Sequence, residues 1–158
     1  MIHVHVYEKW WIGLTVAMLI AFSLAIGVSG FMMGIQLPSP EALVNPNTVA
    51  KQGDFANPGL KELAPKKYVA YIRAEANPWK FRPEKIEVPV GSTVTFYVTA
   101  VDVQHGFKLE GTNINVQILP GQVSKMTATF NQKGEFPFVC TEFCGVGHQN
   151  MFGKLIVK

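Results

Sequence analysis

The chain has 158 residues, of which 48% are hydrophobic and 16% are charged, and its formal net charge is +3. Its mean hydropathy of +0.18 is high for a soluble domain. This composition excludes an intrinsically disordered chain, which needs low hydrophobicity and high net charge, and two cysteines exclude a miniprotein held by several disulfides. The small charge, without a long basic run, argues against a nucleic-acid partner.

The apolar residues are concentrated near the N-terminus, and no charged residue occurs between Lys9 and Glu41. We predict a short cytoplasmic N-terminus over 1–9 and a transmembrane helix in contact with membrane lipid over 10–37. A helix of that length would extend about 42 Å, and the hydrocarbon core of a bilayer is about 30 Å thick. A cleaved signal peptide is the alternative, but its apolar region covers only about 7–15 residues and follows a basic segment.

The charges that flank the predicted helix give a weak preference for its orientation. Glu8 and Lys9 balance one another before the helix, whereas the residues after it, through Val49, contain one acid and no Lys or Arg. Together with the α-amino group, this bias favours an N-terminus inside the cell and a following domain on the outer face.

The segment 38–67 contains five prolines in 30 residues. Proline breaks helices and removes ladder hydrogen bonds from sheets. We therefore predict a linker or a loosely structured lead-in over 38–67.

From residue 68 to the C-terminus, apolar residues follow the period of two that is typical of half-buried strands. After Thr93, for example, Val94, Phe96 and Val98 alternate with polar residues. We predict strands over 68–74, 93–99, 106–110, 115–119, 124–130, 135–140 and 152–157. Such short strands, separated by turns rich in Gly and Pro, predict an all-β antiparallel sandwich or barrel over 68–158.

Metal-binding side chains are concentrated in one loop. The run C-T-E-F-C-G-V-G-H-Q-N-M places Cys140, Cys144, His148 and Met151 within 12 residues, and His105 lies 35 residues before the first cysteine. Thiolate and thioether are soft ligands and imidazole is intermediate, a set that copper favours over magnesium or calcium. We therefore predict a copper site formed by the strand edge at His105 and this loop.

Each donor also has a simpler explanation. The two cysteines could form a disulfide, and the methionine could belong to a hydrophobic core. Covalent haem requires C-x-x-C-H, which is absent from the sequence, and a structural zinc site has no use for methionine. A mononuclear blue-copper site uses one cysteine, whereas two thiolates can bridge two copper ions that are each completed by one histidine.

The loop closely resembles the dinuclear CuA loop of subunit II of haem-copper cytochrome c oxidases, whose pattern is C-x-E-x-C-G-x-x-H-x-x-M. Every position of that pattern is matched over 140–151, and the run D-V-Q-H-G-F at 102–107 resembles the upstream histidine motif of the family. The runs at 110–121 and 148–153 resemble the short, single-span subunit II of the B-family, ba-type oxidases. The resemblance implies a cupredoxin-like fold for the β domain.

The resemblance also implies a role for each donor. The two cysteines would bridge two copper ions, the upstream histidine and the methionine would complete one copper, and the second histidine and a backbone carbonyl would complete the other. The implied ligands are His105, Cys140, the backbone carbonyl of Glu142, Cys144, His148 and Met151. Trp79 lies in the region where the family places an aromatic residue near the surface at which electrons enter.

The implied activity belongs to a terminal cytochrome c oxidase in the plasma membrane of a prokaryote, with the copper domain on the outer, periplasmic face. This chain would take electrons from a c-type cytochrome or a small copper protein. It would pass them to haem in subunit I, where O2 is reduced to water and protons are pumped. A small additional membrane subunit would also fit, and the haems would belong to the partner alone.

Two other functions could use the same site: the CuA subunit of a nitric oxide reductase and a stand-alone membrane-tethered copper carrier. A copper chaperone would not need all six donors, and the length excludes a nitrous oxide reductase, which has a large propeller domain. Residues 42–158 hold 13 basic and 9 acidic residues. This balance argues against a strong acidic patch for a basic cytochrome.

Overall fold

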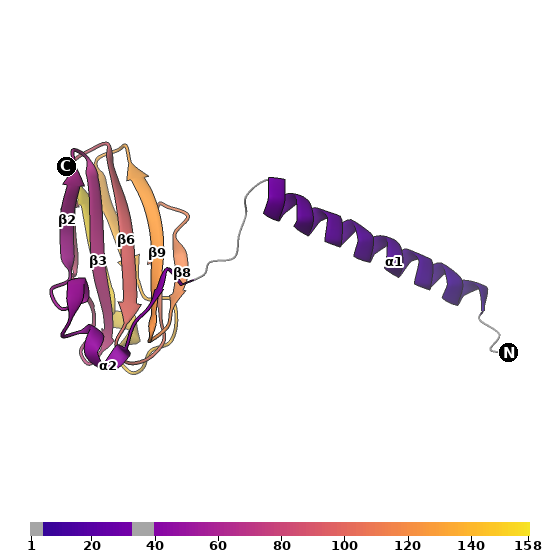
Figure 1. Cartoon of the computed structure of the whole chain (residues 1–158), viewed down its shortest axis with the longest axis horizontal. Helices are drawn as coiled ribbons and strands as arrows, with labels where there is room; N and C mark the ends of the chain where they lie inside the picture. The colour runs from indigo at the N-terminus through magenta and orange to yellow at the C-terminus, as the bar shows by residue number, and fades with distance from the viewer. Residues whose placement is uncertain (1–4, 33–39) are drawn as a thin grey trace. The chain divides into compact units, whose positions relative to one another are not determined.

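The computed structural model describes residues 5–32 and 40–158 (Figure 1). The chain divides into two compact units, Met1–Leu37 and Pro38–Lys158. The first contains a single long helix in its described part, and the second contains the β-sheets and every predicted metal donor.

The first unit contains helix α1 (Val6–Gly27), which continues as a π-helical turn, η1 (Val28–Met32). Together they form a helix of 27 residues that contains an 18-residue window with a mean hydropathy of 2.2, so the helix is long and apolar enough to cross a membrane. The predicted span over 10–37 differs at its start, because the helix begins four residues earlier. The last part of the predicted span, 33–37, lies outside the described residues.

The early start of α1 has a local cause. His5 Nδ1 accepts a hydrogen bond from the backbone N–H of Tyr7, and the Glu8 carboxylate accepts one from the backbone N–H of His5. This reciprocal capping box satisfies two backbone donors at the helix start. It therefore extends the helix beyond the apolar run and into the charged residues that precede it.

The second unit is a sandwich of two β-sheets. The first has the order β1-β9-β6-β3-β2, with β4 also paired to β3, and the second has the order β5-β11-β10-β7-β8. The strands are β1 (Ala42–Leu43), β2 (Gly59–Ala64), β3 (Lys67–Ala76), β4 (Trp79–Arg82), β5 (Lys85–Val88), β6 (Ser92–Ala100), β7 (His105–Leu109), β8 (Asn115–Ile118), β9 (Gln122–Phe130), β10 (Gly134–Val139) and β11 (Phe152–Val157). All seven predicted strands are present, with ends that agree to within two residues.

The predicted sandwich is confirmed, but its strands are not all antiparallel. The pairs β3–β6 and β5–β11 are parallel. Parallel neighbours require a crossover connection between them. Here β4 and β5 provide that connection, because the chain leaves β3, visits the second sheet at β5 and returns to the first sheet at β6. The alternating sequence pattern carries no information about this return.

An aromatic cluster lies between the sheets and fixes the strands that lead to the metal donors. Phe81, Phe107 and Phe138 are fully buried, and their ring centroids lie 5.3–5.5 Å apart. Phe107 belongs to β7 and Phe138 to β10, the strands that carry or precede the first histidine and the first cysteine of the site. Burial of such rings contributes about 1.5–3 kcal/mol each to the stability of this end of the sandwich.

In its described residues, 40–67, the lead-in is more ordered than predicted. It contains β1, a short helix α2 (Pro46–Val49), a 3-10 turn η2 (Gly53–Phe55) and β2. Val49 and Phe55 form a second, smaller hydrophobic cluster with residues of the outer face of the first sheet. The prolines are compatible with this structure because Pro46 occupies the first turn of α2, where no N–H partner is needed, and others flank β2 without interrupting it.

Candidate metal centre

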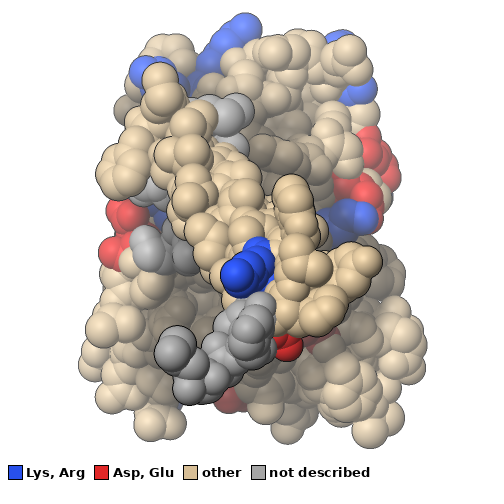
Figure 2. Space-filling view, turned by 90° about the vertical axis from the view of Figure 1, so that its right-hand side faces the viewer, with Lys and Arg blue, Asp and Glu red and all other residues tan. Residues whose placement is uncertain are grey.

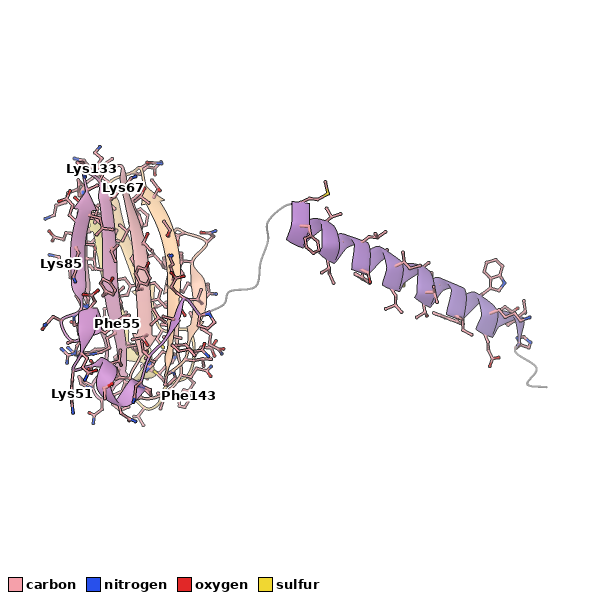
Figure 3. All side chains as sticks on the ribbon, in the orientation of Figure 1. Lys51, Phe55, Lys67, Lys85, Lys133 and Phe143 are labelled. Carbon is pink, nitrogen blue, oxygen red and sulfur yellow. The ribbon has the colours of Figure 1, made fainter. Side chains whose placement is uncertain are left out.

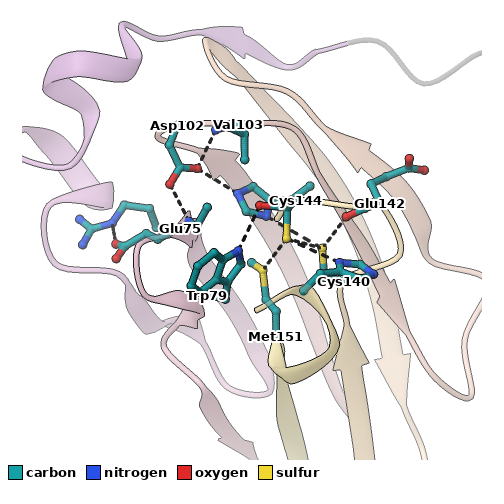
Figure 4. A network of polar contacts seen from close by, with 12 residues as sticks. Glu75, Trp79, Asp102, Val103, Cys140, Glu142, Cys144 and Met151 are labelled. Atoms are coloured by element: carbon teal, nitrogen blue, oxygen red, sulfur yellow. Dashed lines mark hydrogen bonds and ion pairs between the residues drawn. The ribbon is translucent and has the colours of Figure 1, made fainter. Parts of the chain in front are cut away.

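The predicted donors come together at one end of the sandwich (Figure 4). His105 is the first residue of β7, Cys140 directly follows β10, and Met151 directly precedes β11. Because β10 pairs with both β7 and β11, these three positions are neighbours at the same sheet end. The loop between β10 and β11 contributes Cys144 and, on the short helical turn η3 (His148–Asn150), the second histidine.

The two thiols form the centre of this cluster. The Sγ atoms of Cys140 and Cys144 lie 3.8 Å apart, and both cysteines are free and buried. His105 Nδ1 is 3.9 Å from the first sulfur, and His148 Nδ1 is 3.6 Å from the second. A disulfide has an S–S distance of about 2.05 Å, so the structure shows a thiol pair with one imidazole on each side.

The remaining two donors lie against the same sulfurs. Met151 Sδ is buried and lies 3.7 Å from Cys144 Sγ, and the backbone oxygen of Glu142 lies 3.3 Å from Cys140 Sγ. The Glu142 carboxylate points elsewhere and accepts a hydrogen bond of 3.3 Å from Gln104 Nε2. The structure thus brings all six sequence-predicted donors into one cluster.

Asp102 holds the first histidine in place. His105 is 0% exposed, and its Nε2 atom lies 3.0 Å from Asp102 Oδ1. The same carboxylate accepts hydrogen bonds from the backbone N–H groups of Val103 at 2.7 Å and Ala76 at 2.6 Å. Burial opposes the protonated imidazole, but the contacts with Cys140 and Asp102 outweigh it and raise the pKa of His105.

Sequence reasoning assigned no role to Asp102, although it lies in the quoted histidine motif. An acidic residue three positions before a candidate ligand is the available signal, because metal-binding histidines commonly donate their second ring N–H to a carboxylate. With Nε2 directed at Asp102, the Nδ1 atom remains free to face the thiols.

The two thiols are unequal in the absence of a cation. Burial acts against both thiolates, but contacts with His105 and with the backbone N–H groups of Gly106 and Glu142 outweigh it and lower the pKa of Cys140 to about 6. For Cys144, burial and repulsion from the first thiolate raise the pKa to about 12. Without a cation, the site therefore favours one thiolate. A bound cation would favour ionisation of the second thiol as well.

The loop approaches β7 closely because Gly106 has no side chain. A Cβ atom at Gly106 would lie 2.0 Å from Thr141 Oγ1 and 2.8–2.9 Å from the backbone nitrogens of Thr141 and Glu142. On the opposite side of the loop, Trp79 Nε1 donates a hydrogen bond of 3.1 Å to the backbone oxygen of Cys144. The ligand loop is thus held between β7 and β4.

Two apolar side chains on the outer surface of the loop are exposed. Phe143 is 81% and Val146 is 84% exposed, whereas the adjacent cysteine sulfurs are buried. Phe143 lies at the end of the sandwich opposite to Lys67 and Lys133 (Figure 3). Exposed apolar side chains and buried sulfurs therefore lie on the same loop.

Comparison with known proteins places the chain in a family. A sequence profile described as "Cytochrome C oxidase subunit II, periplasmic domain" matches residues 80–157. Cytochrome c oxidase subunit 2 of a Thermus thermophilus strain is 41% identical over 160 residues, which cover 96% of this chain and 92% of that protein. The chain belongs to the cytochrome c oxidase subunit II family. The resemblance seen in the sequence is thereby confirmed.

Solved structures agree with membership of the subunit II family. A chain in the cryo-EM structure of a heme-copper terminal oxidase dimer has a TM-score of 0.71 and 35% identity, with 96% of this chain and 99% of that chain covered. The periplasmic domain of subunit II of cytochrome oxidase from Bradyrhizobium japonicum has a TM-score of 0.52 at 20% identity, covering 57% of this chain and 83% of that domain. The similarity to the Bradyrhizobium domain supports the fold alone.

The apolar helix α1 indicates that this family member is anchored in a membrane.

Proposed function

We propose that this chain is the electron-accepting subunit of a terminal cytochrome c oxidase, working through a dinuclear CuA centre. The observation that carries the proposal is the buried pair of free thiols, 3.8 Å apart, with a separate imidazole 3.6–3.9 Å from each sulfur. A mononuclear blue-copper site takes one thiolate and two histidines and would leave one buried thiolate without a cation. Two copper ions use every donor.

The proposed ligand assignment is the one that the resemblance to the CuA loop implies. Both cysteine sulfurs would bridge the two ions, with His105 and Met151 completing one ion and His148 and the Glu142 backbone oxygen completing the other. When bound, the copper pair would supply one-electron redox chemistry, with the change in charge spread over two metals and two sulfurs.

The protein supports electron transfer by limiting the movement of the ligands. Three donors are attached directly to strand ends, and the aromatic cluster immobilises those strands. Asp102 fixes the ring of His105, and burial keeps water from the sulfurs. Ligands that are held in place before and after electron transfer need little rearrangement, which lowers the barrier to the transfer.

Trp79 is our candidate for the residue through which electrons enter. Its indole N–H donates to the Cys144 carbonyl at 3.1 Å, and the side chain is half-buried. The tryptophan is therefore connected to Cys144, a proposed bridging ligand, by one hydrogen bond to the backbone oxygen of that residue. A donor that contacts the indole edge would have a short route to the copper pair.

The proposed electron donor is a c-type cytochrome or a small copper protein that docks on an apolar surface. Phe143 and Val146 provide exposed apolar area beside the site. Many charges of the sandwich are compensated by ion pairs, such as Lys80–Glu84, Lys108–Glu110 and Lys154–Glu135. Residues 42–158 hold 13 basic and 9 acidic residues, and the acidic side chains visible in Figure 2 lie in small separate groups, so attraction of a basic partner by one acidic patch is not expected.

The proposed location is the plasma membrane of a prokaryote, with the copper domain on the periplasmic face. The charges on either side of the apolar run 10–37 support an N-terminus inside the cell. The lead-in joins the sandwich through β1, which pairs with Gln122 and Val123 at the start of β9.

The partners would be a haem-containing subunit I, where O2 is reduced to water with proton pumping, and optionally a small membrane subunit. The nitric oxide reductase and stand-alone carrier alternatives are not favoured, because the relatives are cytochrome c oxidase subunits.

Copper loading of the full-length chain in detergent tests the dinuclear site. We expect two copper ions per chain, a purple colour and a mixed-valence EPR spectrum with one unpaired electron shared by both nuclei. Cys144→Ser should abolish this spectrum because one bridge is lost, and Gln149→Ala, at an exposed position of the same loop, should preserve it. A blue mononuclear spectrum, or one copper per wild-type chain, would contradict the proposal.

The terminal acceptor is tested separately in the purified membrane complex. We expect the complex that contains this chain to consume O2 when it is supplied with a reduced c-type cytochrome. Consumption of nitric oxide without O2 consumption would identify the reductase alternative, and purification of the chain without a haem protein would favour the stand-alone carrier.

A further inference from the structure

Trp79 lies beneath the turn that connects two of the proposed ligands. It is the first residue of β4, and its indole lies beside Cys144 and Met151 (Figure 4). The turn 145–147 runs from Cys144 to His148, and the backbone N–H of His148 closes it by donating to the Gly145 oxygen at 3.1 Å. The indole therefore contacts a segment whose two ends both carry a donor atom.

The contact between the indole and this turn leaves no space for a side chain. A Cβ atom at Gly147 would lie 2.3 Å from indole Cε3, and one at Gly145 would lie 3.1 Å from indole Nε1. Gly145 also has a φ of 120°, in a region that side-chain-bearing residues rarely adopt. The inner side of the turn is thus bare backbone packed on the ring, and the indole N–H adds its hydrogen bond to the Cys144 oxygen.

Few other described contacts hold this part of the loop. Val146, at the tip of the turn, and its neighbours Phe143 and Gln149 are exposed. The other half of the site is different, because Cys140 and His105 are attached to β10 and β7, and Asp102 holds the imidazole. The half of the site that contains Cys144 and His148 therefore depends on the contact with Trp79.

We propose that Trp79 is a positioning residue that orders the turn 145–147, and with it Cys144 and His148, before any metal binds. This inference rests on the proposed copper site but assigns Trp79 a task other than electron transfer. An immobile indole below two glycines fixes the separation of the two donors. A ligand pair that is already in place loses less conformational freedom when the metal binds, which favours tight and slowly reversible binding.

Hydrogen exchange of the metal-free, full-length chain in detergent tests the inference without copper. Trp79→Ala should increase amide exchange in the peptide 140–151 by about tenfold, the equivalent of one lost hydrogen bond of roughly 1.4 kcal/mol. Trp79→Phe keeps a ring but loses the N–H donor and should give a smaller increase. Val146→Ala, in the same turn but directed to solvent, should leave exchange unchanged.

Gly147→Ala provides a second test in which the tryptophan is retained. The added methyl group would overlap the indole, so the turn or the ring must move, and exchange in 140–151 should rise as it does in Trp79→Ala. Exchange in β6, which is remote from the loop, serves as the control for intact folding. If Trp79→Ala does not fold, the inference is tested with Trp79→Phe and Gly147→Ala instead. Unchanged exchange of the loop in folded variants would overturn the inference.

Copper release to a chelator separates this inference from the proposed function. We expect faster release from Trp79→Ala and Gly147→Ala than from Val146→Ala, with the mixed-valence spectrum still formed at saturating copper. If the wild-type chain never forms that spectrum, the dinuclear site is wrong. If it does form, and the loop exchange and copper release of the folded variants match those of the wild type, only the positioning role of Trp79 is wrong.

Discussion

At the scale of single residues, the geometry of the site depends on groups that are not ligands. Asp102 accepts hydrogen bonds from the imidazole of His105 and from two backbone N–H groups, one of them at the end of β3. It thereby connects a buried histidine, which we propose as a ligand, to a strand of the opposite sheet. A carboxylate in this position selects the ring nitrogen that faces the thiols and limits rotation of the ring.

Replacing this carboxylate should weaken copper binding. For Asp102→Ala we expect copper affinity to fall by about 10–100-fold, because the ring of His105 loses its only described side-chain hydrogen bond to oxygen. Asp102→Asn keeps one acceptor oxygen and should lose less. Competition with a chelator in the full-length chain measures the affinity, with Glu110→Ala, a half-buried acid outside the donor cluster, as the control. Equal affinity in Asp102→Ala and the wild type would show that the contact has no such role.

The unequal thiols predict a two-step titration of the metal-free chain. A thiol loses its proton as the pH rises above its pKa, so the lowered pKa of Cys140, about 6, and the raised pKa of Cys144, about 12, predict one thiolate per chain between pH 7 and pH 9. Ultraviolet thiolate absorbance measures this directly. Cys140→Ser should remove the step near pH 6. Ionisation of both thiols together near the ordinary value of about 8.5 would disprove the coupling.

At the scale of secondary-structure elements, the site is formed by three strand ends and one loop that approach one another closely. β7 and the loop after β10 approach so closely that Gly106 touches the backbone of residues 141 and 142. This approach brings His105 to the thiols and places backbone N–H groups near the Cys140 sulfur. The element arrangement therefore depends on the absence of a side chain at one position.

Gly106→Ala tests this dependence. The added Cβ would overlap both a side chain and two backbone nitrogens, so we expect the free energy of unfolding to fall by about 1–3 kcal/mol. Gly59→Ala is the matched control, because nothing lies within 4 Å of a Cβ at that strand position and its φ is ordinary. Denaturant unfolding of the metal-free chain measures both. A Gly106→Ala chain as stable as Gly59→Ala would mean that the loop can move aside at little cost.

At the scale of the whole molecule, the lead-in is part of the sandwich unit and not a free tether in its described residues. Arg73 of β3 donates hydrogen bonds to the backbone oxygens of Ala50 and Phe55 at 3.2 and 2.8 Å. Its guanidinium also pairs with the buried carboxylate of Glu75, which accepts a second bond from Arg82. Part of the outer face of the first sheet is thus covered by the lead-in and linked to it.

Removal of the Arg73 side chain should detach this segment. Arg73→Ala would lose two hydrogen bonds to the lead-in and leave Glu75 with one cation instead of two. We expect a loss of about 2 kcal/mol in stability and rapid protease cleavage within 44–58. Lys61→Ala removes an exposed pair with Asp54 in the same region and should change cleavage little. Slow cleavage of both variants would show that apolar packing alone retains the lead-in.

Much of the fold and site could be predicted from local sequence patterns. The apolar run indicated a membrane helix, the alternation over 93–99 indicated a half-buried strand, and the loop over 140–151 contains four donors within reach of one another. Each of these signals lies within a short stretch of chain, where backbone geometry alone relates spacing to position. The prolines of 38–67 misled the prediction, because their effect depends on whether they lie inside an element or beside it.

Only the tertiary structure decided the rest. Three features join distant segments: the parallel return of β6, the contact of Asp102 with Ala76, and the packing of Trp79 on a glycine turn. That turn directly follows Cys144, the hydrogen-bond partner of Trp79, which lies 65 residues later in the sequence. No local periodicity encodes such contacts, because they depend on which strands pair and on how side chains fill the space between two sheets. The sequence by itself determined which residues can bind the metal, and the packing of the sheets determined how rigidly they are held.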